Sequence, residues 1–248
     1  GVYELLGGHT RDIRPLFFVA SIPAIVSVGL IVFVREAAGH HRAPRVSVTE
    51  VRSEYPRHYW RVLVFLALFA VVNFSDALLI LRAKSLGLGF AAIIGVYALY
   101  NLSYASLSYP AGHLSDRVPR RLVFAAGLAV FAVAYVGLGV VTTEVWVCPL
   151  LALYGAFTAL TDGVGKAWIS DLLPPDRHGS GLGLYQGVLG AGSLVAGVWA
   201  GLAWHGNGRV PLVISGSVVA VLALVLVIGG ERLERGSPGR PAARADGA

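Results

Sequence analysis

The sequence contains no methionine, only one cysteine (Cys148) and few charged residues. A single cysteine excludes an internal disulfide framework as the basis of the fold. Charged residues make up 14% of the 248 residues, whereas a soluble globular domain carries about 25%. Hydrophobic residues reach 56%, and the mean hydropathy is +0.69. These proportions exclude an ordinary soluble domain and indicate an integral membrane protein.

Several kinds of functional motif are also missing. The sequence has no Walker motif, no nucleophile elbow and no zinc signature, so we expect no cofactor and no metal. The adjacent residues His40 and His41 have no acid or cysteine at ligand spacing, which is typical of an ordinary loop. The formal charge of +6 comes from basic residues scattered in short loops rather than interleaved with aromatic residues. This pattern favours loops beside a lipid bilayer over nucleic-acid binding.

Long apolar runs dominate what is present. A helix needs about 20 apolar residues to cross the hydrocarbon of a bilayer, and seven stretches qualify. The sequence therefore predicts an all-α, polytopic membrane protein with seven transmembrane helices. The predicted spans are residues 15–34, 62–81, 88–110, 122–143, 145–170, 179–204 and 210–230.

The distribution of Lys and Arg predicts the orientation of these spans. Fourteen Lys and Arg residues flank the spans on the side that holds the long loop 36–60, and five flank them on the other side. Because positively charged loops stay in the cytoplasm, the long loop and the C-terminus are predicted to be cytoplasmic. Residues 1–14 are then extracytoplasmic. The tail 231–248, rich in Pro, Gly and charge, is predicted to be disordered.

A loop between the third and fourth spans carries an ordered motif. Residues 111–121 read AGHLSDRVPRR, which resembles the signature loop of the major facilitator superfamily, roughly Gly-x-x-x-Asp-Arg-x-Gly-Arg-Arg. Pro119 stands where that signature has its second glycine, so the turn there must be made differently. The matching residues are Gly112, Asp116, Arg117, Arg120 and Arg121.

The resemblance implies an assignment of the whole chain. In that family the signature is cytoplasmic, which agrees with the charge count, and a copy of it lies between helices eight and nine. Residues 15–35 would then be helix six, 36–60 the central cytoplasmic loop, and 61–230 the C-terminal six-helix half of a twelve-helix transporter. The chain begins at Gly1 without methionine, so we expect a processed product or a fragment lacking helices one to five. Its N-terminal half would be a partner in transport, and the five signature residues would close a cytoplasmic gate.

Two charged residues interrupt the fifth span. A charge at the bilayer centre costs about 2.5–3.5 kcal/mol, and such residues usually face a bundle interior or water. Asp162 and Lys166 are spaced i and i+4, so they share one helix face and can form an ion pair. Tyr154 and Thr158 continue the same face. Asp162 is the candidate for coupling, and Lys166 either holds it ionised or reaches the interface.

A second polar stripe lies on the third span, and a second acid lies on the second span. The stripe consists of Tyr97, Asn101, Tyr104 and Ser108, and together with Thr158 it would line a pathway. Asp76, with Asn73 three residues before it, is predicted to lie near the outer end of its span, whereas Asp162 lies nearer the cytoplasmic end. Asp76 is either part of an alternating pathway or a hydrogen-bond partner between packed helices.

These observations predict a secondary active transporter that moves a small solute by alternating access, coupled to protons, in the cytoplasmic membrane of a bacterium. Two alternatives remain at this stage. A seven-helix receptor or retinal protein would use the intramembrane Lys166 as a Schiff base, but retinal proteins carry that lysine in their last helix. An intramembrane enzyme that transfers phospholipid headgroups would need more carboxylates at fixed spacing than Asp171 and Asp176 supply.

Overall fold

The computed structural model describes residues 21–22, 25–26, 29 and 55–234. The chain divides into two units, Gly1–Val51 and Arg52–Ala248, and the five described residues of the first unit are helical. The start 1–14, the loop with His40 and His41, and most of the span 15–34 lie outside the described residues. Their assignments therefore stay predictions.

The described part of the second unit consists of α-helices and two short 3₁₀ turns, without strands. This confirms the all-α prediction. Five of its helices are long and apolar enough to cross a membrane, namely α6 to α10. The count of seven spans stays a prediction. The helices are α4 (Arg57–Ala70), α5 (Asp76–Ser85), α6 (Phe90–Arg117), α7 (Arg120–Val140), α8 (Val147–Asp171), α9 (His178–Leu202) and α10 (Arg209–Glu234), with 3₁₀ turns at Glu144–Trp146 and Pro175–Arg177.

The prediction of one continuous helix over 62–81 is wrong, because the structure breaks it between α4 and α5. Polar side chains explain the break. Ser75 caps α5 by accepting a hydrogen bond from the Ala77 N–H at 3.3 Å, and Asp76 follows in the first turn, where the helix dipole favours an acid. From α9, the indole of Trp199 donates to the carbonyl of Val71 at 2.7 Å. The break therefore has both a local cap and a tertiary partner.

Two other predicted boundaries also move. The helix α6 continues through Arg117, so the signature is not a long loop, and the chain turns over the extended Val118 and over Pro119. The helix α10 continues to Glu234, so the predicted disorder does not begin at 231.

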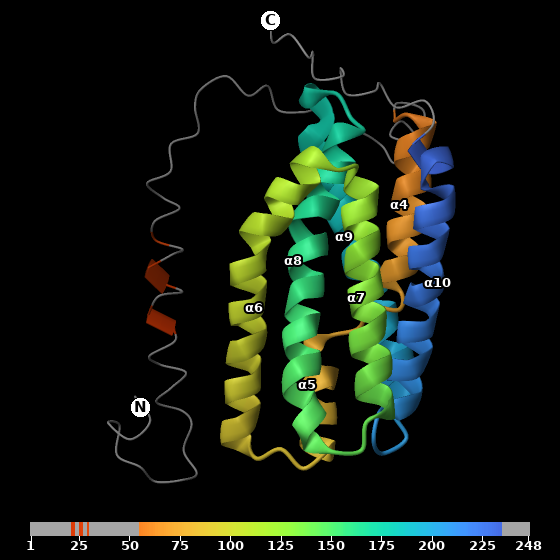
Figure 1. Ribbon diagram of the computed structural model, residues 1–248. Coiled ribbons are helices and arrows are strands. Elements are labelled where there is room, and N and C mark those ends of the chain that lie inside the picture. Colours follow the sequence, from red (N-terminus) through yellow and green to blue (C-terminus); the bar gives the residue numbers. More distant parts are fainter. Residues whose placement is uncertain (1–20, 23–24, 27–28, 30–54, 235–248) are drawn as a thin grey trace, which may run out of the picture. The chain divides into compact units, whose positions relative to one another are not determined.

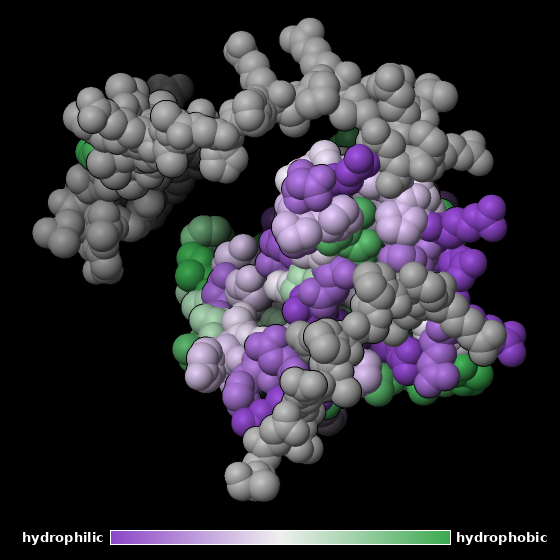
Figure 2. Space-filling model, turned by 90° about the horizontal axis from the view of Figure 1, so that it is seen from above, coloured by the Kyte–Doolittle hydropathy of each residue, from purple (hydrophilic) through white to green (hydrophobic). Residues whose placement is uncertain are grey.

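Successive long helices run in opposite directions along the bundle (Figure 1). The end where α6 stops and α7 begins, called the signature end below, is joined by polar contacts. Arg120 of α7 forms a 3.0 Å ion pair with Asp171 at the end of α8. Arg61 of α4 donates to the carbonyl of Arg232 in α10 at 3.0 Å. Viewed from this end, hydrophilic side chains cover much of the surface and hydrophobic ones appear at its margins (Figure 2).

Aromatic rings form the centre of the bundle. Phe131 of α7 is fully buried and stacks on Tyr135, with ring centroids 3.8 Å apart. It also meets Phe157 of α8 at 4.9 Å and Phe69 of α4 at 5.6 Å. These contacts join three helices around one set of rings.

Apolar side chains also cover the outside of the bundle. On α10, Val221, Leu224 and Ile228 are 59%, 61% and 83% exposed, and α6 and α9 also carry exposed aliphatic residues. Such surfaces are unfavourable in water and favourable in lipid.

The helices α6 and α8 cross closely at Gly155. A Cβ placed on Gly155 would lie 2.5 Å from the carbonyl oxygen of Tyr100 and 2.9 Å from the Cβ of Ser103. Ser103 bonds across the same crossing, donating to the carbonyl of Ala152 at 2.7 Å. Only glycine allows this approach of the two backbones.

We therefore expect Gly155→Ala to destabilise the protein by about 1–3 kcal/mol, because backbone atoms cannot yield as a flexible side chain can. The measurement is thermal unfolding of the purified protein in detergent. Gly183→Ala on α9 is the control, since a Cβ there meets nothing within 4 Å, and it should not lower the melting temperature. Equal melting temperatures for Gly155→Ala and the unmodified protein would contradict the prediction.

Candidate functional site

A cavity of about 210 Å³ lies among α4, α5, α6, α7, α8 and α9. It brings together four of the residues that the sequence predicts for a pathway, namely Asn73, Asp76, Thr158 and Asp162. Its aromatic lining consists of Phe69, Tyr100, Phe124, Tyr154, Phe157 and Tyr185.

Asp162 binds two of the other predicted residues. Its Oδ1 lies 2.8 Å from Lys166 Nζ, so the ion pair expected from their spacing is present. Its Oδ2 accepts a 3.2 Å hydrogen bond from the hydroxyl of Tyr104 on α6. The Asp162 and Lys166 side chains are each 44% exposed, which places the pair at an open side of the cavity rather than in the packed core.

Asp76 lies at a different level of the same cavity. Its Oδ1 accepts a 2.6 Å hydrogen bond from Tyr154 of α8. Because Tyr154 and Asp162 are eight residues apart on one helix, the levels of the two acids differ by about 12 Å. Asp76 is a hydrogen-bond partner between packed helices, and it lines the cavity. The structure thus shows the hydrogen bond that one reading expected, and the role of Asp76 in an alternating pathway stays a prediction.

The other predicted residues on α6 make their contacts within that helix. Asn101 donates to the carbonyl of Tyr97 at 2.8 Å, and Ser108 donates to the carbonyl of Tyr104. Tyr97 stacks on Tyr100 at 5.5 Å. Asn101 is exposed and is not among the residues that line the cavity.

Sequence reasoning missed most of the aromatic lining. Tyr100 falls between members of the predicted polar stripe, yet it stacks on Tyr154 at 5.4 Å and lines the cavity. Phe157 and Tyr185 line it too. Aromatic residues within an apolar span do not by themselves separate a cavity wall from a packed core.

The signature residues occupy one end of the bundle. Gly112, Asp116 and Arg117 lie in the last two turns of α6. Arg121 of α7 pairs with Glu231 of α10 at 3.1 Å, and the Arg120–Asp171 pair joins α7 to α8 in the same region. These two pairs link helices within one bundle.

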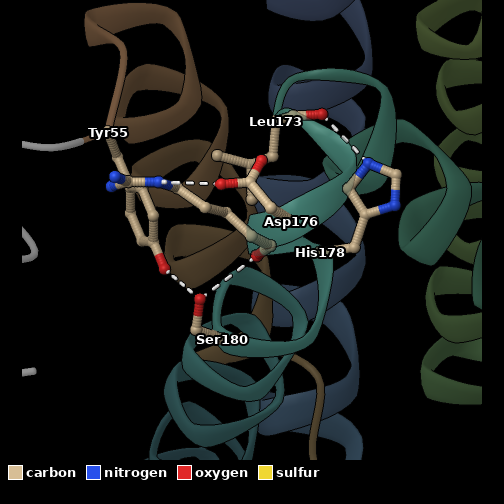
Figure 3. Close-up of polar contacts among 6 residues, drawn as sticks. Tyr55, Leu173, Asp176, His178 and Ser180 are labelled. Carbon is tan, nitrogen blue, oxygen red and sulfur yellow. Dashed lines mark hydrogen bonds and ion pairs between the residues drawn. The ribbon is translucent and has the colours of Figure 1, made fainter. Parts of the chain in front are cut away.

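A further set of contacts closes the turn between α8 and α9 at this end. Tyr55, just before α4, donates to Ser180 at 2.7 Å (Figure 3). His178 donates through Nε2 to the carbonyl of Leu173 at 3.0 Å. From α4, Tyr59 donates to the carbonyl of Gly181 at 2.9 Å. The start of α4 therefore binds the start of α9.

The opposite end is held by an arginine that sequence reasoning placed in a loop. Arg82 of α5 is only 3% exposed, and its guanidinium donates to the carbonyls of Leu138, Val141 and Asn207 at 2.9, 2.8 and 3.0 Å. It thereby binds the C-terminal end of α7, where the helix dipole favours a cation. Arg209 adds a 3.1 Å bond to the carbonyl of Gly139.

No group of three His, Cys, Asp or Glu residues suited to a metal ion occurs among the residues that the structure describes. The polar groups that line the cavity are two carboxylates, the amide of Asn73 and the hydroxyls of threonine and tyrosine side chains.

Comparison with known proteins gives consistent matches. Residues 62–246 match the model of the Major Facilitator Superfamily. An uncharacterised transporter of this type from Methanocaldococcus jannaschii is 32% identical over 179 residues, which are 70% of this chain and 45% of that protein. A puromycin resistance protein of Streptomyces alboniger is 28% identical over 171 residues, or 65% of this chain and 34% of that protein. Another uncharacterised transporter of this type, from Mycobacterium tuberculosis, is 26% identical over 179 residues, which are 70% of this chain and 31% of that protein.

The chain thus spans between about a third and a half of the length of these relatives.

Proposed function

Since the chain belongs to the major facilitator superfamily, as its signature led us to expect, we propose that it takes part in secondary active transport of a small solute coupled to protons. It is an integral, multi-pass membrane protein of a transporter family, and this assignment disfavours the receptor, retinal and enzyme alternatives. The solute, the coupling ion and the contribution of an N-terminal half are parts of the proposal.

The observation that carries the proposal is the pairing of Asp162 beside the cavity. The groups that face its carboxylate are Lys166 on its own helix, Tyr104 on α6 and the nearby Tyr185 on α9. When Asp162 is ionised, Lys166 and Tyr104 hold it. When it takes up a proton, the ion pair with Lys166 is lost, and the hydrogen bond from Tyr104 loses the charge that strengthens it. Protonation therefore changes which of two packings of α6 and α8 is favoured, as coupling requires.

The charge asymmetry supports a proposal for the orientation. We propose that the signature end faces the cytoplasm, because Lys and Arg gather there, and that the membrane is the cytoplasmic one. An N-terminal half would complete the pathway. Alternating access then consists of rocking the two halves about the cavity.

The proposal is tested by solute flux. Puromycin is the first solute to try, because one relative is named as a puromycin resistance protein. The complete protein is reconstituted in proteoliposomes, a pH gradient is imposed, and accumulation of radiolabelled puromycin is measured with and without a protonophore. A panel of other small solutes follows. Accumulation that the protonophore leaves unchanged would contradict proton coupling.

The Arg120–Asp171 pair provides a test of the proposed gate. We expect Arg120→Asp to slow transport by about fivefold, a small effect for an element that biases a two-state equilibrium. The Arg120 side chain is 14% exposed and that of Asp171 is 46% exposed, so thermal unfolding of each variant is measured beside the transport rate. Adding Asp171→Arg restores the pair with reversed charges and should restore the rate. If the double variant stays as slow as Arg120→Asp, the pair is not the relevant contact.

A further inference from the structure

The break between α4 and α5 presents two oxygen acceptors to the cavity. Asp76 and Asn73 both line it. Tyr154 donates to Oδ1 of Asp76, which leaves Oδ2 for a further donor, and Oδ1 of Asn73 is buried without any hydrogen-bond partner among the described residues. A buried acceptor such as Asn73 Oδ1 is normally satisfied. A ligand that brings N–H donors would satisfy both.

The charge at this level of the cavity is negative. Asp162 is neutralised by Lys166, whereas no Lys, Arg or His in the part of the chain that the structure describes forms an ion pair with Asp76. The nearest basic residue along α5, Arg82, is engaged with carbonyl groups at the far end. A cation would therefore be favoured beside Asp76, and an anion would be repelled.

Aromatic rings stand next to these oxygens. Tyr97, Tyr100 and Tyr154 form a continuous stack, with centroids 5.5 and 5.4 Å apart, and Phe157 extends it from Tyr154 at 5.3 Å. Ring faces attract both cations and other rings. The volume also fits, because a cavity of about 150 Å³ in another protein holds benzene, and this one measures about 210 Å³.

We propose that Asp76 and Asn73 bind the ammonium group of an aromatic amine, whose ring lies against Tyr100 and Tyr154. The ammonium N–H groups donate to the free carboxylate oxygen and to the Asn73 oxygen, and the hydroxyl of Tyr154 keeps the carboxylate oriented. This inference rests on the proposed function and names the solute class that the cavity recognises.

The test compares three probes that share a phenyl ring and differ in charge. Binding of 2-phenylethylamine, 2-phenylethanol and 3-phenylpropionate to the complete purified protein is measured by isothermal titration calorimetry at neutral pH. The amine should bind about tenfold more tightly than the alcohol, as for a charge-assisted hydrogen bond, and the carboxylate should bind most weakly. Equal affinities for amine and alcohol would overturn the proposal.

Two variants and a control locate the site. Asp76→Asn should remove the preference for the amine, because the amide keeps the shape and the Tyr154 bond but loses the charge. Asn73→Ala should weaken amine binding by about threefold without affecting the alcohol. Asp176→Asn removes one negative charge from an exposed turn at the signature end and should leave all affinities unchanged. A preference for the amine that survives Asp76→Asn would overturn the assignment. If Asp76→Asn does not fold, the three-probe comparison and Asn73→Ala still decide.

Flux measurements separate this inference from the function on which it rests. Proton-driven flux of another solute, together with no preference for the amine, would overturn the inference and leave transport standing. Selective amine binding that Asp76→Asn abolishes would support the inference even if no proton-driven flux were found, in which case only the proposed function would fail.

Discussion

Replacing Asp162 with asparagine should reduce proton-driven transport to the level of protein-free vesicles. The amide cannot take up and release a proton, and it cannot form the 2.8 Å ion pair with Lys166. Its oxygen can still accept the hydrogen bond from Tyr104. The substitution therefore imitates the protonated acid permanently and removes the switch without enlarging or filling the cavity.

The measurement uses two assays on the same proteoliposomes. Accumulation driven by a pH gradient should be lost, whereas exchange of labelled for unlabelled solute should persist, because exchange requires reorientation of the loaded protein and no net proton movement. Asp176→Asn is the matched control for loss of a carboxylate and should retain both activities. Undiminished gradient-driven accumulation in Asp162→Asn would remove the coupling role from this residue.

Replacing Arg82 with methionine should cause the largest loss of stability of any single substitution considered for this chain. The side chain is almost fully buried and donates to three carbonyl oxygens. Two of them belong to the C-terminal end of α7 and one to the connection between α9 and α10. Methionine fills a similar volume but donates nothing, so these acceptors lose a charged donor at once. Hydrogen bonds to charged groups contribute about 1.5–3 kcal/mol each and are not additive. We expect a loss of about 3 kcal/mol, which corresponds to a fall in melting temperature of about 6–12 °C for a chain of this size.

Thermal unfolding in detergent provides the measurement. Lys84→Met, two residues further on α5, removes an exposed cation and should change the melting temperature little. Arg82→Lys keeps the charge but lacks the planar guanidinium that reaches all three carbonyls. Its melting temperature should therefore lie between those of Arg82→Met and Lys84→Met. If Arg82→Met had the same melting temperature as Lys84→Met, the hydrogen bonds of Arg82 would not contribute to stability.

Part of the candidate site could be predicted because it is local. Asp162 and Lys166 are four residues apart in a long helix, and helical geometry alone places them on one face. Thr158 could be placed on the same face for the same reason. The partner from another helix, Tyr104, was on the predicted stripe of α6, but only packing decided that its hydroxyl would reach Asp162.

The break in the predicted span 62–81 shows the limit of this reasoning. Hydropathy averaged over 20 residues does not register a stretch as short as Asn73 to Asp76. Its effect depends on the cap by Ser75 and on Trp199 arriving from α9 more than 100 residues later. The hydrogen bond between Asp76 and Tyr154 likewise depends on how α5 and α8 meet. It could not be predicted because the two residues are far apart in the sequence.

The sequence by itself determined that this is an all-α membrane protein with a major facilitator signature and an acid–base pair in one helix. Each of these follows from composition, from residue order or from helical period, which act over a few residues. Only the tertiary structure decided that a broken helix brings Asp76 and Asn73 to a cavity walled by Tyr100 and Tyr154, and that Arg82 is buried. These features depend on contacts between helices that are distant in the chain, and the energies of such contacts are set by packing in three dimensions.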